Sequence, residues 1–339
     1  MSGSREYPPS VELTRLMDGA VIAQLICLAA DLGVADLLAE GTRSLVELAE
    51  RTGSSPDALQ RMLRTLASAG VFAEPEPGIF ALTPLAEPLR TDSADSVRDL
   101  ARIRGSREHW RTIGELRHSV RTGRAAFDQV HGTDWWTYLD THPGQSGLFI
   151  RAMGDQARQV HLAAADAYDF STAKRLVDVG GGRGDLVALL LGRYPGLTAV
   201  VYDRPRAVAE AEAVLTGAGV RDRAEPVAGD FFESVPPDGD VYLLSRILHD
   251  WNDEQAVAVL RAVARAISPG GKVVLVELVV PEGDAFHPAR TMDLIMLAMH
   301  GGKERSVSGF AALFAAAGLA YVETRPTGSP MSLVIAEAR

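Results

Sequence analysis

Hydrophobic positions change their spacing about half-way along this chain of 339 residues. In the second half, short apolar runs alternate with helical patterns, and this alternation predicts a parallel sheet covered by helices. The strands are expected at residues 176–179, 198–202, 224–228, 241–245 and 272–280. A helix at 310–318 and an antiparallel strand pair at 321–324 and 332–336 complete a doubly wound α/β domain over 171–339.

The first half of the chain is predicted to be mainly helical. Apolar residues recur at helical spacing over 13–38, and this segment is so apolar that something must cover it, for instance a partner subunit. Helical and strand patterns between 44 and 82 predict a winged helix within residues 1–92. We treat 93–170 as a helical linker. Its helices are expected at 98–124 and 134–168, with breaks near 127–132 and 142–144.

Composition and charge exclude several classes of protein. The 44 acidic and 34 basic residues give a net charge of -10, which opposes binding to phosphate backbones and anionic membranes. The single cysteine, Cys27, lies in an apolar run, so no internal disulfide can form and a buried thiol is expected. No signal-peptide pattern is present, and no apolar stretch reaches the roughly 18 residues of a membrane span. We therefore expect a cytoplasmic protein that binds neither nucleic acid nor membranes.

The first predicted strand ends in a glycine-rich loop, GGGRGD at 180–185. Glycines let a ligand approach the backbone, although such a loop alone also serves nicotinamide and flavin binders, or is merely a tight turn. Asp203 ends the second strand about 20 residues later, where a carboxylate accepts hydrogen bonds from ribose hydroxyls. This position fits a nicotinamide cofactor and S-adenosyl-L-methionine (SAM) equally.

The end of the third strand discriminates between these cofactors. Asp230 follows Gly229 there, and its carboxylate can accept a hydrogen bond from an adenine amino group while the ring of Phe231 covers the base. The alternative is an ordinary turn with core phenylalanines. Ser245 and Arg246 end the fourth strand. Because the carboxyl ends of parallel strands meet at one edge of a sheet, all these residues are expected at a single site.

Five sequence motifs follow one another along the chain: LVDVGGGRGD at 176–185, GDFFE at 229–233, ILHDWNDE at 247–254, SPGGKVVLVE at 268–277 and GGKERS at 301–306. Together they resemble the plant caffeic-acid-type O-methyltransferases and their bacterial natural-product relatives. The resemblance implies a Rossmann-like domain that uses SAM without a metal ion and releases S-adenosyl-L-homocysteine. It also implies a winged-helix dimerisation domain that joins two subunits into a homodimer. It is weakest at 94–147, a stretch that helps shape the substrate pocket.

By this resemblance, the cofactor site comprises Asp178, Gly180, Gly181, Gly182, Asp203, Arg204, Gly229, Asp230, Phe231, Ser245 and Arg246. Two positions depart from the family pattern. Arg204 stands where leucine is commoner, a change we interpret as tolerated. Ala157 stands where plant relatives have a serine that helps to bind the cofactor carboxylate, so this contact stays unassigned.

Methyl transfer from SAM needs a base and correct alignment, because the sulfonium already activates the methyl group. The resemblance makes His249 the general base and places the carboxylates of Glu277 and Glu304 beside it. A carboxylate partner fixes the tautomer of the imidazole and supports its protonated form. We favour Glu277 for this role because it ends a strand, whereas Glu304 lies in a loop and is alternatively a solvated charge. A purely structural His249 is the other interpretation.

The predicted acceptor is a small aromatic molecule that is methylated on a phenolic oxygen. Six residues are expected to line its pocket: Phe149, Met153, Asp250, Met292, Met296 and His300. Thioether contacts suit a flat ring, although core packing explains the apolar members equally well. Asp and Glu residues do not show the paired spacing of a magnesium site, so no metal is expected.

Two other functions compete with this prediction. A winged helix also occurs in DNA-binding regulators, but residues 44–90 carry four arginines against six acidic residues, a net charge of -2 that does not suit a groove-binding surface. Methylation of a ring carbon is the second, since removing the phenolic proton also makes the neighbouring carbon nucleophilic. Diversion of the fold to hydroxylation or decarboxylation would more naturally accompany loss of the base, which is present. We rank oxygen methylation first.

Overall fold

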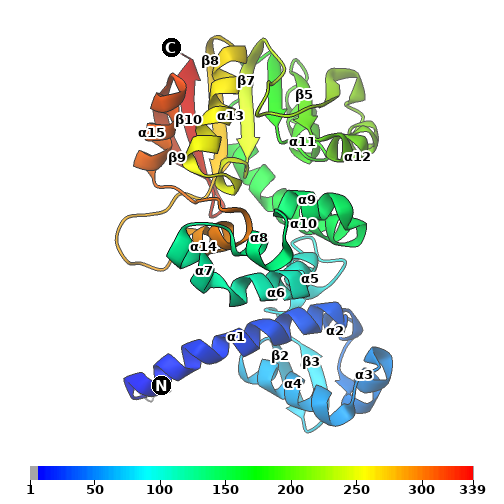
Figure 1. Cartoon of the computed structure of the whole chain (residues 1–339). Coiled ribbons are helices and arrows are strands. Elements are labelled where there is room, and N and C mark those ends of the chain that lie inside the picture. The colour runs from blue at the N-terminus through cyan, green and yellow to red at the C-terminus, as the bar shows by residue number, and fades with distance from the viewer. Residues whose placement is uncertain (1–6, 339) are drawn as a thin grey trace, which may run out of the picture. The chain divides into compact units, whose positions relative to one another are not determined.

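The computed structural model describes residues 7–338, apart from the side chains at positions 155 and 156, and forms two units (Figure 1). One unit contains the chain up to Trp110 together with Leu139–Gln156, and the other contains Arg111–Tyr138 and Ala157–Arg339. This division differs from the expected one, because residues 93–170 contribute to both units instead of forming a separate linker. Residues 111–138 therefore fold with the α/β domain.

The first unit begins with a long helix, α1 (Pro9–Asp31), and a short one, α2 (Val34–Leu37). A single helix was expected at 13–38, but Gly33 adopts a positive φ of 68° and ends the run. We expected no segment of membrane-spanning length, yet α1 reaches it by length and composition, with 11% of its most apolar window buried. Its large exposed apolar side chains are Val11, Leu13, Leu16, Met17, Val21 and Leu28.

A winged helix follows α1 and α2, as predicted. It contains α3 (Leu45–Thr52), α4 (Pro56–Ser68) and a three-stranded sheet of order β1-β3-β2, whose strands are β1 (Arg43–Ser44), β2 (Phe72–Glu76) and β3 (Ile79–Leu82). Ser44 and Glu47 form a capping box that starts α3. The apolar sides of the two helices bury Leu48 and Leu63 against Phe72 of the sheet, which gives this part of the chain its own core.

The connecting region is more segmented than its sequence suggests. Its helices are α5 (Arg98–Gly105), α6 (Arg107–Gly114), α7 (Leu116–Thr122), α8 (Ala126–His131), α9 (Trp135–Thr141) and α10 (Pro143–Ala167). The break at 142–144 is confirmed, but the break expected at 127–132 is wrong because α8 forms there. The ring of Phe127 is buried edge-on against Trp135 and Tyr138, so tertiary packing holds α8 where propensity alone is weak.

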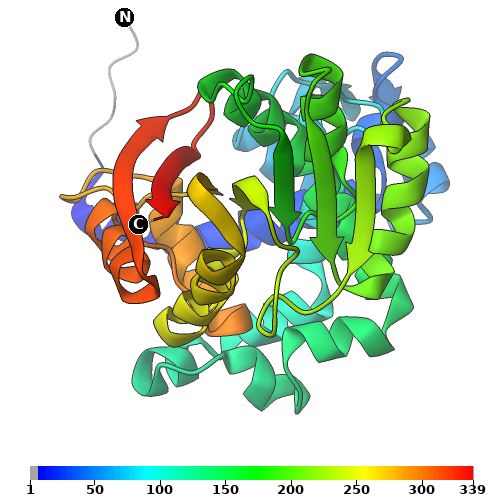
Figure 2. The same ribbon diagram turned by 90° about the horizontal axis from the view of Figure 1, so that it is seen from above.

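The second unit contains a seven-stranded sheet of order β6-β5-β4-β7-β8-β10-β9 (Figure 2). Its strands are β4 (Arg175–Val179), β5 (Thr198–Asp203), β6 (Ala224–Ala228), β7 (Gly239–Ser245), β8 (Ile267–Glu277), β9 (Leu319–Pro326) and β10 (Ser332–Ala338). The first five pair in parallel, and the last two add the antiparallel edge that the sequence predicts. Strand β8 ends at Glu277 instead of 280, which places that side chain at the edge of the sheet.

Helices cover both faces of this sheet. One apolar cluster joins α10, α11 (Asp185–Arg193) and α12 (Pro205–Gly217) to one face, and the other joins α13 (Asp253–Ala266) and α15 (Val307–Ala317) to the opposite face. Leu176 and Val177 are neighbours on β4 and belong to different clusters, because successive side chains alternate between the faces. With both faces filled, the carboxyl edge of the parallel strands is the place left for a ligand.

Candidate active site

The loop after β4 leaves no room for side chains. Gly180 and Gly182 have positive φ angles of 74° and 57°. A Cβ atom on Gly180 would lie 2.3 Å from Ile247 Cδ1, and one on Gly181 would lie 2.8 Å from Asp178 Oδ2. Both the backbone conformation and the space therefore require glycine. Helix α11 begins directly after this loop and presents its first backbone N–H groups there.

Two carboxylates lie beside the glycine loop. Gly182 N–H donates to Asp203 Oδ2 at 2.8 Å, and Arg204 N–H donates to Asp203 Oδ1 at 2.6 Å. Burial raises the pKa of Asp203, while burial and the Asp203 carboxylate raise the pKa of Asp178 to about 7. A ligand that brings positive charge and hydroxyl donors would relieve this accumulation of acidic groups. SAM brings both, so the residues present fit this cofactor.

The end of β6 offers another acceptor. Phe232 N–H donates to Asp230 Oδ1 at 2.9 Å, which fixes the exposed carboxylate and leaves its second oxygen for a ligand. The half-buried ring of Phe231 stands edge-on to Trp251, with 6.0 Å between centroids. A Cβ atom on Gly229 would lie 2.2 Å from Tyr202 Oη, so glycine is needed here as well. Gly180, Gly181, Gly182, Asp203 and Asp230 lie at the carboxyl ends of β4, β5 and β6, and we call this set the cofactor edge.

The end of β7 carries two half-buried polar residues, Ser245 and Arg246. Ser245 Oγ is buried and has no hydrogen-bond partner among the described residues. Arg246 adopts a positive φ of 56°, which is uncommon for a residue with a side chain, and its N–H donates to Val276 O at 3.0 Å. Burial lowers the pKa of its guanidinium, against the opposing effects of Asp250 and Glu277. Such strain at a strand end is typical of a functional site.

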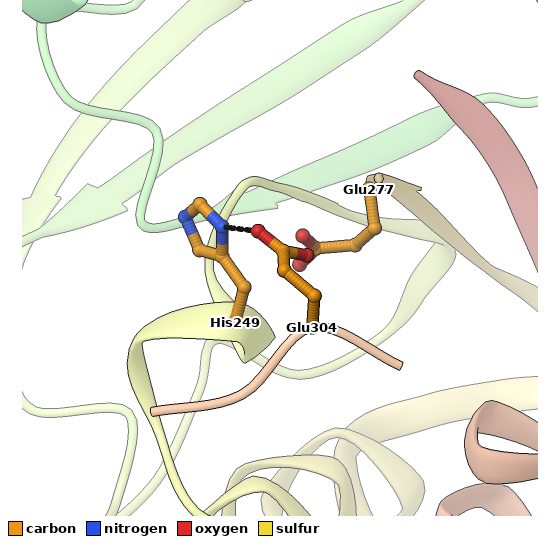
Figure 3. A group of neighbouring side chains, drawn as sticks. All are labelled: His249, Glu277 and Glu304. Atoms are coloured by element: carbon orange, nitrogen blue, oxygen red, sulfur yellow. Dashed lines mark hydrogen bonds and ion pairs between the residues drawn. The ribbon is translucent and has the colours of Figure 1, made fainter. Parts of the chain in front are cut away.

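His249 lies on a short 3-10 turn (Leu248–Asp250) just after β7. Its Nδ1 is 2.8 Å from Glu304 Oε1, and the Glu304 side chain is fully buried (Figure 3). Burial and the neighbouring Asp293 carboxylate raise the pKa of Glu304 to about 8. A carboxylate beside Nδ1 fixes the tautomer of the imidazole, and its ionised form supports a positive charge on the ring. Because Glu304 engages Nδ1, the nitrogen left to act on a substrate is Nε2.

Glu277 plays a different part from the one we expected. Its Oε1 accepts hydrogen bonds from the backbone N–H groups of Ile247 and Leu248, at 3.1 and 2.8 Å. The interpretation of Glu277 as the direct partner of His249 is therefore wrong, because its carboxylate holds the backbone of the turn while Glu304 contacts the ring. The alternative of a solvated Glu304 is also wrong, since that residue is only 2% exposed. Burial raises the pKa of Glu277 to about 7.

Arg305 fixes the GGKERS loop against the turn that carries His249. Its buried guanidinium donates to Leu248 O through Nη1 and to Trp251 O through Nη2, each at 2.8 Å. Lys303 N–H donates to His249 O at 2.9 Å. A Cβ atom on Gly302 would lie 2.1 Å from that same oxygen, so the two segments touch backbone to backbone. The sequence motif GGKERS pointed to this segment, but the individual roles of Gly302 and Arg305 were not predicted.

The acid–base cluster of His249, Glu277 and Glu304 also has the composition of a metal site. One ligand atom from each residue lies within 4.8 Å of the others, and the two carboxylates are buried. A divalent cation is attracted to such a set by its charge. Assays of this protein therefore need a chelator arm that separates acid–base chemistry from metal chemistry.

Helix α14 (Pro288–His300) carries three of the residues expected to contact the acceptor. Met296 is buried, Met292 is half-buried, and the ring of His300 stacks on Trp136 with 5.3 Å between centroids. Phe149 and Met153 are half-buried on the part of α10 that belongs to the first unit, and their place against this site stays a prediction.

Trp136 is a residue that sequence reasoning missed. Its ring stacks on Trp251, with 6.2 Å between centroids, and lies 5.7 Å from Arg204 Cζ, a cation–π distance. Arg204 can therefore make a cation–π contact with Trp136, which the leucine commoner at this position could not. The adjacent tryptophans at 135 and 136 were a signal, but they lie where the family motifs are weakest.

Two family models match the chain. The O-methyltransferase domain matches residues 113–320, and the O-methyltransferase dimerisation domain matches residues 14–92. The chain belongs to the O-methyltransferase family.

Similar proteins span nearly its whole length. Phenazine O-methyltransferase of Lysobacter antibioticus is 42% identical over 98% of this chain and 96% of its own. The 3-amino-4-hydroxybenzoate 4-O-methyltransferase of Streptomyces cremeus is 42% identical over 90% of this chain and 84% of its own. A solved O-methyltransferase from neocarzinostatin biosynthesis, in complex with SAM and 2-hydroxy-5-methyl naphthoic acid, has a TM-score of 0.83 at 36% identity and covers 94% of this chain and 96% of its own.

This O-methyltransferase is a SAM-dependent enzyme, which confirms the predicted activity, cofactor and fold class. Membership sets aside the DNA-binding regulator, because the winged helix falls within the dimerisation domain. It also disfavours methylation of a ring carbon, since the two enzymes named above are O-methyltransferases. The assignment of individual site residues is a separate matter that rests on geometry.

Proposed function

We propose that this O-methyltransferase transfers a methyl group to a phenolic hydroxyl of a small aromatic natural product, with His249 as the general base. The observation that carries the proposal is the contact between His249 Nδ1 and the buried Glu304 carboxylate, which leaves Nε2 for a substrate. The ring is only 12% exposed, so water competes little for that nitrogen. A positioned acid–base group of this kind suits a phenol that must lose its proton.

The proposed reaction requires one proton transfer and one displacement. Nε2 takes the proton of the phenolic hydroxyl, and Glu304 stabilises the imidazolium that forms. SAM, when bound, supplies an activated methyl group. The phenolate oxygen forms a bond to that methyl carbon as the bond from carbon to sulfur breaks, which yields the methyl ether and S-adenosyl-L-homocysteine. His249 then releases its proton to solvent.

We assign the cofactor to the cofactor edge. Asp203 would accept hydrogen bonds from the ribose hydroxyls, and Asp230 would accept one from the adenine amino group beside Phe231. The glycine loop admits the ligand close to the backbone, and Ser245 Oγ offers a buried polar atom near the same edge. Asp178, Arg204 and Arg246 complete the set, with Arg204 packed over Trp136.

Aromatic acceptors are named for the similar enzymes, including a phenazine and an aminohydroxybenzoate. In this chain, Met292, Met296, Asp250 and His300 of the second unit would contact such a ring. The family resemblance adds Phe149 and Met153 to this set. A flat apolar ring with polar substituents suits this combination of thioether and carboxylate groups.

We also propose that the enzyme works as a cytoplasmic homodimer that binds neither nucleic acid nor membranes. The exposed apolar side chains of α1 need a cover, and this helix overlaps the dimerisation domain that begins at residue 14. A second copy of the chain buries them without insertion into lipid, which the charges at Glu12, Arg15 and Asp18 oppose. Light scattering after gel filtration would contradict the dimer by giving the mass of a monomer at micromolar concentration.

The decisive experiment follows labelled methyl groups from SAM to a panel of phenols in the presence of excess chelator, with mass spectrometry to place the label. We expect label on oxygen, and a loss of about 10²- to 10⁴-fold in kcat for His249→Ala. S-adenosyl-L-homocysteine affinity should be unchanged in that variant. His118→Ala, which removes a histidine of α7 outside the site, is the control. Label on carbon, or full activity in His249→Ala, would contradict the proposal.

A further inference from the structure

The acid–base cluster contains two buried carboxylate oxygens that no donor satisfies. Glu277 Oε2 and Glu304 Oε2 have no hydrogen-bond partner among the described residues. Glu277 is fully buried, and Glu304 is 2% exposed. The two carboxylates come from different segments, β8 and the GGKERS loop, and lie next to each other (Figure 3). Buried oxygens without a partner are costly, so this pair should attract a proton or a cation.

The cations already present in this region do not meet that need. Arg305 is buried, but its Nε donates to Asp253 Oδ1 at 2.9 Å, and its two Nη atoms donate to backbone carbonyl oxygens. His249 Nδ1 contacts Oε1 of Glu304, which is the other oxygen of that carboxylate. Among the described residues, no side chain therefore donates to either of the two unsatisfied oxygens.

The three side chains of the acid–base cluster are spaced as ligands of one metal ion. One ligand atom from each residue lies within 4.8 Å of the other two. A tetrahedral zinc ion with bonds of about 2.0–2.2 Å to nitrogen and oxygen holds its ligand atoms about 3.4 Å apart. Small rotations of the side chains bring the three atoms to that separation. One imidazole and two carboxylates suit zinc, whereas Mg²⁺ prefers a shell made of oxygen atoms alone.

We infer that the acid–base cluster binds a zinc ion and that the bound ion inhibits the enzyme. The ligands are His249 Nδ1 and one carboxylate oxygen from each of Glu277 and Glu304, and water completes the tetrahedron. The ion is an inhibitor and not a cofactor, because it takes the place from which Glu304 supports the base. The inhibition rests on the proposed function, whereas zinc binding does not depend on it.

Zinc at Nδ1 would prevent His249 from acting as a base. A neutral imidazole has one N–H group and one nitrogen with a free lone pair. When Nδ1 gives its lone pair to zinc, the proton lies on Nε2, so Nε2 cannot take the proton of a phenol. That N–H group can still donate a hydrogen bond to the phenolic oxygen. The phenol and SAM should therefore bind, while methyl transfer stops.

The test titrates the full-length enzyme, freed of metal with a chelator, with Zn²⁺ and separately with Mg²⁺ in a calorimeter. We expect one high-affinity Zn²⁺ per chain and no saturable binding of Mg²⁺. Glu277→Gln and Glu304→Gln each replace a charged ligand and should weaken Zn²⁺ binding about 100-fold, at least as much as the loss of an outer-shell partner. Unchanged S-adenosyl-L-homocysteine affinity in both variants shows that they are folded.

Two controls identify zinc that binds elsewhere on the protein. Cys27→Ser removes the single thiol of the chain, and His118→Ala removes a histidine of α7. Both variants should keep the full affinity for Zn²⁺. Equal affinity for Zn²⁺ in the unmodified enzyme and in both glutamine variants would overturn the site. Equal affinity of the unmodified enzyme for Mg²⁺ would overturn its assignment to zinc.

Steady-state kinetics then tests the inhibition. Saturating Zn²⁺ should lower kcat at least about 10-fold and change the KM for the phenol by no more than about 2-fold, and excess chelator should restore kcat. Full activity with zinc bound at the cluster would overturn the inhibition alone. Zinc binding at the cluster of an enzyme that transfers no methyl group to any phenol in excess chelator would overturn the proposed function and the inhibition, and would support the site.

Discussion

At the end of β4, the cofactor edge is shaped by glycines whose places no side chain can take, and its hydrogen bonds run between β4 and the next strand. The acid–base cluster is built differently, because Arg305 reaches back 57 residues to hold the turn that carries His249. One region is fixed by sterics that are local to a strand and its loop. The other depends on a tertiary contact, so, under the proposed function, changes to that contact should affect methyl transfer more than cofactor binding.

The largest difference is expected between the two glutamates of the acid–base cluster. Glu304→Gln should lower kcat about 100-fold, because an amide cannot stabilise the imidazolium of His249. Glu277→Gln should cost about 10-fold or less, since an amide oxygen still accepts the backbone N–H groups of Ile247 and Leu248. Single-turnover kinetics with saturating SAM measures both. Equal losses in the two variants would mean that the glutamates do not have separate roles.

A smaller effect should appear on binding rather than on chemistry at the cofactor edge. Gly180→Ala places a Cβ atom 2.3 Å from Ile247 Cδ1 and forces an unfavourable φ, so S-adenosyl-L-homocysteine affinity should fall about 10-fold. Gly192→Ala is the matched control, because that glycine lies in α11 with nothing within 4 Å of the added atom. Calorimetry on both variants decides the matter. Unchanged affinity in Gly180→Ala would show that the loop can move to accommodate the added methyl group.

A further prediction concerns the pH dependence of stability. Burial raises the pKa of Glu277 from 4.5 to about 7, so the folded protein binds this proton more tightly than the unfolded chain does. The free energy of unfolding should therefore fall as pH rises through this range, by up to about 1.4 kcal/mol per pH unit for one such group.

The measurement is denaturant unfolding of the unliganded enzyme at pH 5, 6 and 7. Glu277→Gln cannot ionise and should flatten the decline, whereas Glu254→Gln, which changes an exposed residue, should not. A decline of the same slope in Glu277→Gln would show that Glu277 is already ionised across this range.

The same contrast explains what could be predicted from the sequence. A strand is visible as a short apolar run, so the places of Asp203 and Asp230 at the ends of β5 and β6 could be predicted by position alone. Glu277 was favoured over Glu304 as the partner of His249, because strand periodicity says nothing about which distant loop packs against a turn. Trp136 and α8 were missed for a related reason: both depend on contacts among aromatic rings brought together by the fold. Apolar spacing predicted one helix over 13–38, but it could not show that Gly33 adopts a positive φ and ends α1.

The backbone contact at Gly302 has a consequence for laboratory evolution of new acceptors. No side chain fits at Gly302 against His249 O, and Arg305 donates hydrogen bonds to the backbone of the same segment. Libraries that diversify the GGKERS motif should therefore yield mostly inactive clones. Diversity is better directed to the exposed and half-buried positions of α14, which do not hydrogen-bond to the turn. The GGKERS motif and the turn of His249 should therefore tolerate few substitutions, whereas exposed positions of α14 should tolerate many.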